Sequence, residues 1–165
     1  MKRPDEKELR KFNVYYKYDT DFASHARLLQ SKWREKNGWK MNDKRGSNYG
    51  NFVETAFAQN EKVNFLTDNI KNLVVEKIKE IKNNGGLVGE PRIWNNLLSS
   101  QPLCFNLFGE LCCDPDLATK FFKTLFPNRL DSVTSVKFEH SPGRGDTKYI
   151  GDHSAFDAFV EYTKD

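Results

Sequence analysis

The stretch Ser154–Tyr162, SAFDAFVEY, decides how the C-terminal part of this chain is interpreted. It places Asp157 in the middle of an apolar run of residues that favour β-strands. An ionised carboxylate that is removed from water must be paired, hydrogen-bonded or bound to a metal. Alternate side chains of a strand share a face, so Asp157, Phe159 and Glu161 would point the same way. The two acids either line a ligand site or lie exposed on an edge strand.

A second strand is predicted just upstream. Residues 133–140 alternate between a wetter set containing Val133 and Glu139 and a more apolar set containing Val136 and Phe138. The glycine-rich loop 141–153 returns the chain to the SAFDAFVEY stretch, so the two strands could pair directly.

The residues before these strands have a helical pattern. Apolar residues recur at helical spacing from about 20 to 37 and from 67 to 83. Pro91 can open a further helix to residue 99 or 100, which Pro102 interrupts. Asp114-Pro115 can cap and start another helix, which ends at Pro127. The expected core faces are Phe22, Ala26, Leu29 and Trp33; Ile70, Leu73, Val74, Ile78 and Ile81; and Leu117, Phe121 and Leu125. We expect one α+β domain over 1–165, with a mobile lead-in at 1–12, a mainly helical part at 13–127 and a short sheet at 133–162.

Composition is typical of a globular protein without membrane spans. The 165 residues are 38% hydrophobic and 30% charged, and no apolar run approaches the ~20 residues that cross a bilayer. The N-terminus has no apolar segment of the signal-peptide type, so we expect a cytoplasmic protein. Cys104, Cys112 and Cys113 are expected to be reduced core thiols, because their number and spacing suit neither a disulfide framework nor a zinc site.

Charge is uneven along the chain. Residues 1–45 contain 13 Lys or Arg and 7 Asp or Glu, although the net charge of the whole chain is only +3. A basic segment suits an anionic polymer, but a solvated surface explains it equally well. The aromatic residues nearby, Tyr15, Tyr16, Tyr18, Trp33 and Trp39, could stack on bases or form core.

Three sequence segments together resemble a bacterial branch of the PD-(D/E)XK nuclease superfamily. They are FEHSPGR at 138–144, SAFDAFVEY, and the earlier run NNLLSSQPLCFNLFGEL at 95–111, about a fifth of the chain. The resemblance implies a helix packed on a mixed sheet and a Mg²⁺- or Mn²⁺-dependent nuclease that acts on DNA, less probably on RNA. It implies that Asp157 is the metal-binding aspartate.

The other site residues follow from the same resemblance. Glu139 and Glu161 rank next as catalytic or accessory acids, and the helix acid of the metal site would be Glu110, with Glu90 as the alternative. Arg144 and Lys148, in the loop between the strands, would bind phosphates. Each of these residues also has a plain interpretation as an exposed charge. His140 and His153 are not needed as bases if a metal activates water.

The resemblance also implies that half of the site is missing. The family pattern continues into a further strand that carries Glu-x-Lys, whereas this chain ends at Asp165. Glu161 and Lys164 do not replace it, because three residues apart they would lie on opposite faces of a strand. We therefore expect a C-terminally incomplete nuclease.

The alternatives to a nuclease are a non-catalytic protein that binds nucleic acid or a partner on the same scaffold, and a subunit completed by another chain. A two-stranded sheet leaves open edges, so we also expect self-association or a second subunit at that edge.

Overall fold

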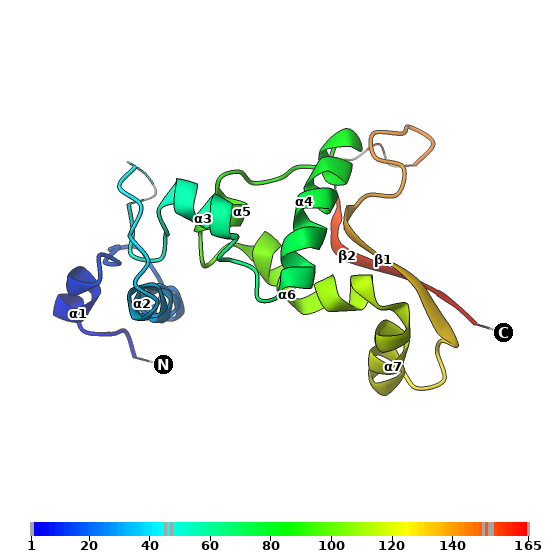
Figure 1. Ribbon diagram of the computed structural model, residues 1–165, viewed down its shortest axis with the longest axis horizontal. Helices are drawn as coiled ribbons and strands as arrows, with labels where there is room; N and C mark the ends of the chain where they lie inside the picture. Colours follow the sequence, from blue (N-terminus) through cyan, green and yellow to red (C-terminus); the bar gives the residue numbers. More distant parts are fainter. Residues whose placement is uncertain (1, 45, 47, 150, 152–153, 165) are drawn as a thin grey trace. The chain divides into compact units, whose positions relative to one another are not determined.

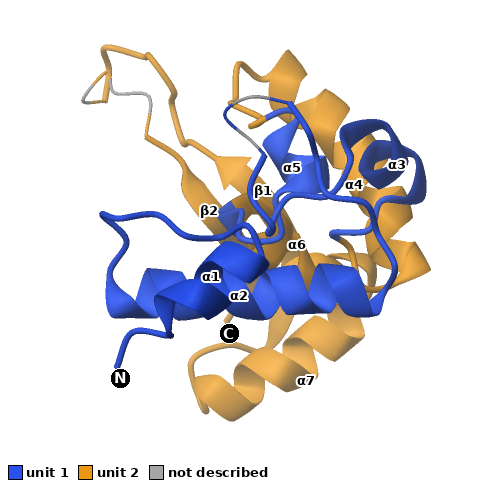
Figure 2. Cartoon of the chain, turned by 90° about the vertical axis from the view of Figure 1, so that its left-hand side faces the viewer, with its two compact units in different colours: residues 1–64, 90–100 blue, residues 65–89, 101–165 orange. Residues whose placement is uncertain are grey.

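The computed structural model describes residues 2–44, 46, 48–149, 151 and 154–164, and His153 therefore lies outside the described part. The chain divides into two compact units (Figure 2). Unit 1 comprises residues 1–64 and 90–100, and unit 2 comprises 65–89 and 101–165. In chain order the elements are α1 (Glu6–Lys11), α2 (Asp21–Lys36), α3 (Thr55–Glu61), α4 (Asp68–Asn83), α5 (Arg92–Asn95), α6 (Ser100–Cys113), α7 (Pro115–Leu125), β1 (Ser132–His140) and β2 (Phe156–Thr163) (Figure 1). This composition confirms the α+β class.

Unit 1 contains α1, α2, α3 and α5, and the N-terminal part of its core consists of Leu9, Val14 and Leu28. Residues 1–12 have no periodic pattern, yet Glu6–Lys11 forms helix α1, which Asp5 caps by accepting from the Lys7 amide. The fully buried Leu9 attaches α1 to α2.

Helix α2 has the predicted extent but the opposite inward face. The predicted core residues Phe22, Leu29 and Trp33 are 73%, 65% and 48% exposed. The residues that α2 buries are Ser24, Leu28, Ser31 and Arg34. The predicted core face was therefore wrong, and the helix turns an apolar stripe outward.

Hydrogen bonds explain this inversion. The buried Arg34 donates through Nε to the Gly50 carbonyl at 2.8 Å and through Nη1 to the Trp39 carbonyl at 2.7 Å. The Ser31 hydroxyl donates to the Phe12 carbonyl at 2.9 Å. Gly50 permits this packing, because a Cβ there would lie 2.0 Å from the Phe12 oxygen and 2.2 Å from Ser31 Oγ. Since buried carbonyls need donors, polar residues of α2 occupy the inward face.

Unit 2 packs α4, α6 and α7 with the sheet. The predicted α4 stripe is confirmed for Ile70, Val74, Ile78 and Ile81, which are buried. Phe105 of α6 stacks on Phe138 of β1 with ring centroids 4.2 Å apart. A second core cluster joins α6, α7 and the sheet and consists of Leu111, Ala118, Phe122, Leu130, Val133 and Val136, with Val160 packed against it.

Two helix predictions in this region need correction. Pro102 does not interrupt a helix from Pro91, because α5 ends at Asn95 and Pro102 lies in the first turn of α6, where its missing N–H costs little. Helix α7 begins as predicted, with the Asp114 carboxylate accepting from the Leu117 amide at 2.9 Å. Its inward face is formed by Ala118 and Phe122, however, and the predicted core residues Leu117, Phe121 and Leu125 are 43%, 42% and 55% exposed.

The strands β1 and β2 pair antiparallel, as Figure 1 shows at the C-terminal end of the chain. Ser135 lies opposite Glu161, Val136 opposite Val160, and Phe138 opposite Ala158. The register shifts between Val133 and Ser135, which turns Val133 into the core instead of onto the wetter face that strict alternation predicted. No helix in the described part of the chain is long and apolar enough to cross a membrane.

Candidate functional site

Glu139 and Asp157 lie at the same end of the strand pair. They fall between the paired residues Phe138–Ala158 and His140–Phe156, and the register does not pair them with each other. The register therefore brings two of the predicted catalytic acids to one end of the sheet.

The backbone of Glu139 has φ 49°, in the left-handed region that a glutamate rarely adopts. Its carboxylate accepts a hydrogen bond from Gln101 Nε2, near the start of α6, at 2.8 Å. Gln101 also donates to the Leu87 carbonyl and accepts from the Gly89 amide. The end of β1 is thus bound to α6, and the Glu139 carboxylate has a defined orientation.

Cys104 of α6 lies beside both acids. Its thiol donates to the main-chain carbonyl of Asp157 at 3.2 Å. Burial, together with the negative charges of Asp157 and Glu139, raises the pKa of Cys104 to about 12. The thiol is therefore protonated at neutral pH, which excludes it as a thiolate nucleophile and leaves it as a hydrogen-bond donor.

Glu161 interacts with β1 on the face opposite the core. Its carboxylate accepts from the Ser135 hydroxyl at 2.5 Å and from Lys137 Nζ at 2.8 Å. The bonds from Lys137 and Ser135 hold the pKa of Glu161 below its usual value, with a smaller contribution from His140. Glu161 is therefore ionised at neutral pH and has a cationic partner.

The two candidate helix acids have other contacts. The Glu110 carboxylate accepts hydrogen bonds from the Thr67 hydroxyl and, at 3.1 Å, from Asn69 at the start of α4. These bonds lower the pKa of Glu110. Glu90 belongs to unit 1, where it accepts from the Trp94 indole at 3.1 Å. Of the two candidates, Glu110 belongs to the same unit as Asp157.

The loop after β1 contributes a cation to a cavity. This cavity, of about 170 Å³, is lined by the end of α4 and the end of β1, including Glu80, Lys137, Glu139, His140 and Arg144. Arg144 and Glu139 therefore border the same space. Lys148 lies farther along the loop, where its amide donates to the Asp146 carboxylate at 2.8 Å.

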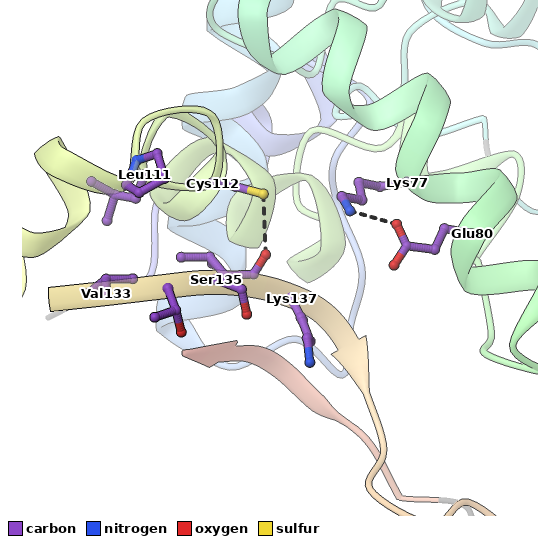
Figure 3. A pocket seen from close by; sticks show the side chains of 10 residues that line it. Lys77, Glu80, Leu111, Cys112, Val133, Ser135 and Lys137 are labelled. Atoms are coloured by element: carbon purple, nitrogen blue, oxygen red, sulfur yellow. Dashed lines mark hydrogen bonds and ion pairs between the residues drawn. The ribbon is translucent and has the colours of Figure 1, made fainter. Parts of the chain in front are cut away.

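A second cavity of about 270 Å³ lies between α4, α6 and β1 (Figure 3). The Lys77–Glu80 ion pair, 2.6 Å long, borders it on α4, and the Cys112 thiol donates to the Val136 carbonyl at 3.2 Å. Burial has the largest single effect and would lower the pKa of Lys77, but the hydrogen bond and the charge of Glu80, with smaller effects of Cys112 and Glu76, together outweigh it, and the net shift is upward. The Lys137 side chain points away from this pair (Figure 3), and its Nζ donates to Glu161 at 2.8 Å.

The structure thus brings Asp157, Glu139 and Arg144 to the end of β1, and it places Glu161 with Lys137 on the outer face of the sheet. Sequence reasoning missed Gln101, Cys104 and Lys137. Gln101 and Cys104 belong to the QPLC segment, and Lys137 belongs to the wetter side of the β1 alternation. The sequence pattern does not show which acids these residues contact, because that depends on the packing of α6 and on the strand register. Among the described residues, no group of three or more His, Cys, Asp or Glu side chains is arranged to hold a metal ion.

A family model of the PD-(D/E)XK nuclease superfamily matches residues 17–165. The chain belongs to the PD-(D/E)XK nuclease superfamily. No curated protein and no solved structure matches it. Membership in this superfamily confirms the sequence resemblance and supports a nuclease-like function with nucleic acid as substrate and divalent metal as the general cofactor type. The match includes every predicted site residue of the PD-(D/E)XK domain.

Proposed function

We propose that the end of the β1–β2 sheet contributes its acids to a Mg²⁺- or Mn²⁺-dependent site that hydrolyses phosphodiester bonds of DNA, less readily of RNA. The position of Glu139 and Asp157 at one end of the β1–β2 sheet, in a chain of the PD-(D/E)XK superfamily, carries this proposal.

The residues fit the donor set of such an ion. Mg²⁺ is commonly held by one or two carboxylates, while water and substrate phosphate complete its octahedral shell. Asp157 and Glu139 offer these oxygens. When bound, the ion would activate water and neutralise charge on the phosphate under attack. The Glu110 carboxylate is bonded to Thr67 and Asn69 at the start of α4. Its role as the helix acid of the metal site therefore stays a prediction.

The remaining residues have positioning and binding roles in this proposal. Gln101 orients the Glu139 carboxylate, and the Cys104 thiol holds the main chain at Asp157. Arg144 and Lys148 bind phosphates of the substrate strand. Lys137 is the nearest charged partner of the accessory acid Glu161 and keeps it ionised.

Calorimetric titration with Mn²⁺ tests the metal site without depending on activity. We expect Asp157→Asn and Glu139→Gln each to weaken Mn²⁺ binding at least tenfold, in the range of ~10–100-fold by which supporting residues of metal sites act. Asp116→Asn, an exposed acid of α7, is the matched control and should bind as the unsubstituted chain does. Unchanged Mn²⁺ binding in both site variants would contradict the assignment.

A cleavage assay then tests the chemistry. Duplex DNA, single-stranded DNA and RNA are incubated with the chain and Mg²⁺ or Mn²⁺, and cleavage should disappear with Asp157→Ala. Substrate binding that persists in EDTA without cleavage under any condition would favour the non-catalytic alternative on the same scaffold.

A further inference from the structure

Positive charge is concentrated in one of the two units. By sequence, unit 1 contains 15 Lys or Arg and 10 Asp or Glu, a net charge of +5, while unit 2 contains 11 and 13, a net charge of −2. Unit 1, which does not contain the β1–β2 sheet, therefore has the positive charge expected of a surface that binds a polyanion.

Three tyrosines form a cluster in unit 1. The rings of Tyr16 and Tyr18 meet edge to face at 5.7 Å, and those of Tyr16 and Tyr49 at 6.4 Å. Tyr18 is 76% exposed and Tyr16 42% exposed. Tyrosines of a core would be covered, so the rings of Tyr16 and Tyr18 offer open π-surface to a ligand.

Cations surround the tyrosine cluster. Lys17 Nζ lies 5.7 Å from the centroid of the Tyr18 ring, and the Arg27 guanidinium lies 5.3 Å from that of Tyr49. Arg27 also pairs with Asp19 at 2.7 Å and donates to Asn51 at 3.2 Å, so its position is fixed and part of its charge is balanced. A base that stacks on Tyr18 would have the Lys17 ammonium within reach of its phosphate.

The segment that carries two of these rings is held in place before any ligand binds. Arg3 donates to the carbonyl of Tyr16 at 2.6 Å and to that of Asp19 at 3.1 Å. Its guanidinium also lies 5.8 Å from the Tyr15 ring. A fixed backbone reduces the entropy lost on binding, which is the physical advantage of a preorganised site.

We infer that the cluster of Tyr16, Tyr18 and Tyr49 with Lys17 and Arg27 is a binding surface for single-stranded nucleic acid. Stacking on exposed tyrosines requires unpaired bases, and the net charge of +5 favours their phosphates over an uncharged peptide. This inference does not rest on the proposed metal site, because stacking and phosphate contacts need no divalent ion.

Fluorescence anisotropy of the full chain in EDTA tests the inference. The probes are labelled oligo-dT, oligo-rU and a DNA duplex of equal length. We expect the double variant Tyr16→Ala/Tyr18→Ala to bind the single strands about tenfold more weakly, as the loss of stacked bases predicts. Affinity should also fall steeply as salt rises from 50 to 200 mM, on the order of the salt dependence of phosphate contacts.

Two matched variants separate stacking from other effects. Tyr18→Phe keeps the ring and should bind within about twofold of the unsubstituted chain, since stacking depends on the π-face. Phe121→Ala, which removes a partly exposed ring of α7 in unit 2, should not change binding. Unchanged single-strand affinity in the double variant, or an equal loss for the duplex, would overturn the inference. The oligo-dT and oligo-rU arms show whether DNA or RNA is preferred.

Discussion

At the residue scale, the candidate site depends on where charged side chains meet their partners. Glu161 illustrates this, because the hydrogen bonds from Lys137 and Ser135 lower its pKa in the folded chain. A carboxyl group whose pKa is lower when folded stabilises the fold at pH values above its unfolded pKa of about 4.3. That contribution disappears as the pH falls through the folded pKa.

Glu161→Gln should therefore destabilise the chain at neutral pH and matter progressively less below about pH 4, the range set by the unfolded Glu pKa. Urea unfolding of both proteins between pH 3 and 7 measures the difference in unfolding free energy. Asp43→Asn, which removes an exposed acid of unit 1, is the control for the loss of one negative charge and should destabilise the chain less than Glu161→Gln at pH 7. A difference between Glu161→Gln and the unsubstituted chain that grows on acidification would contradict this account.

The same residues show what sequence could predict about the site. The position of Asp157 in a strand is readable from the SAFDAFVEY alternation, and the direct pairing of the two strands was a correct expectation. The position of Glu139 at the same end of the sheet as Asp157 was not readable, because it depends on the register. The turn of Glu139 toward Gln101 depends on a φ of 49°, which no residue pattern predicts for a glutamate.

At the element scale, helix extents followed from the sequence better than helix faces. Caps such as Asp114 and stops such as Gly38 act locally, so α2, α4 and α7 begin and end close to their predicted limits. The inward face of a helix is decided by its neighbours instead. The carbonyls of Phe12, Trp39 and Gly50, which lie outside α2, require donors, and Ser31 and Arg34 of α2 supply them.

Adjacent leucines of α2 test its inverted face. Leu28 is 5% exposed and Leu29 is 65% exposed. We expect Leu28→Ala to lower the unfolding free energy by about 2–4 kcal/mol, as a buried leucine does, and Leu29→Ala to change it by less than about 0.5 kcal/mol, as surface substitutions do. Chemical denaturation of the two variants measures both values. Equal effects, or a larger effect at Leu29, would show that the apolar stripe faces a core.

At the scale of the whole molecule, charge and chemistry are divided between the two units. Glu139 and Asp157 of the sheet belong to unit 2, and the excess of basic residues and the exposed tyrosines belong to unit 1. Neither division was evident from overall composition, because a net charge of +3 averages the two units. The sequence already shows a positive excess in residues 1–45, and the assignment of residues to units, in which residues 90–100 return to unit 1, places this excess in unit 1.

The sheet makes a further prediction for the molecule in solution. In the part of the chain that the structure describes, the sheet has two strands, β1 and β2, and each strand is hydrogen-bonded along one side. Unpaired edge N–H and C=O groups, flanked by exposed rings such as Phe156 and Tyr162, favour pairing with another chain. We therefore predict that light scattering will show association that increases with protein concentration.

Charge on this edge should suppress the association. Tyr162→Lys places a cation beside the edge of β2, where natural proteins use lysine to prevent strand pairing, and should return the scattering mass to that of the monomer. Phe121→Lys, which adds the same charge on α7, controls for the change in net charge and should leave association unchanged. If the unsubstituted chain stays monomeric at high concentration, the edge is covered. If both variants dissociate equally, repulsion between whole molecules governs association and the β2 edge does not.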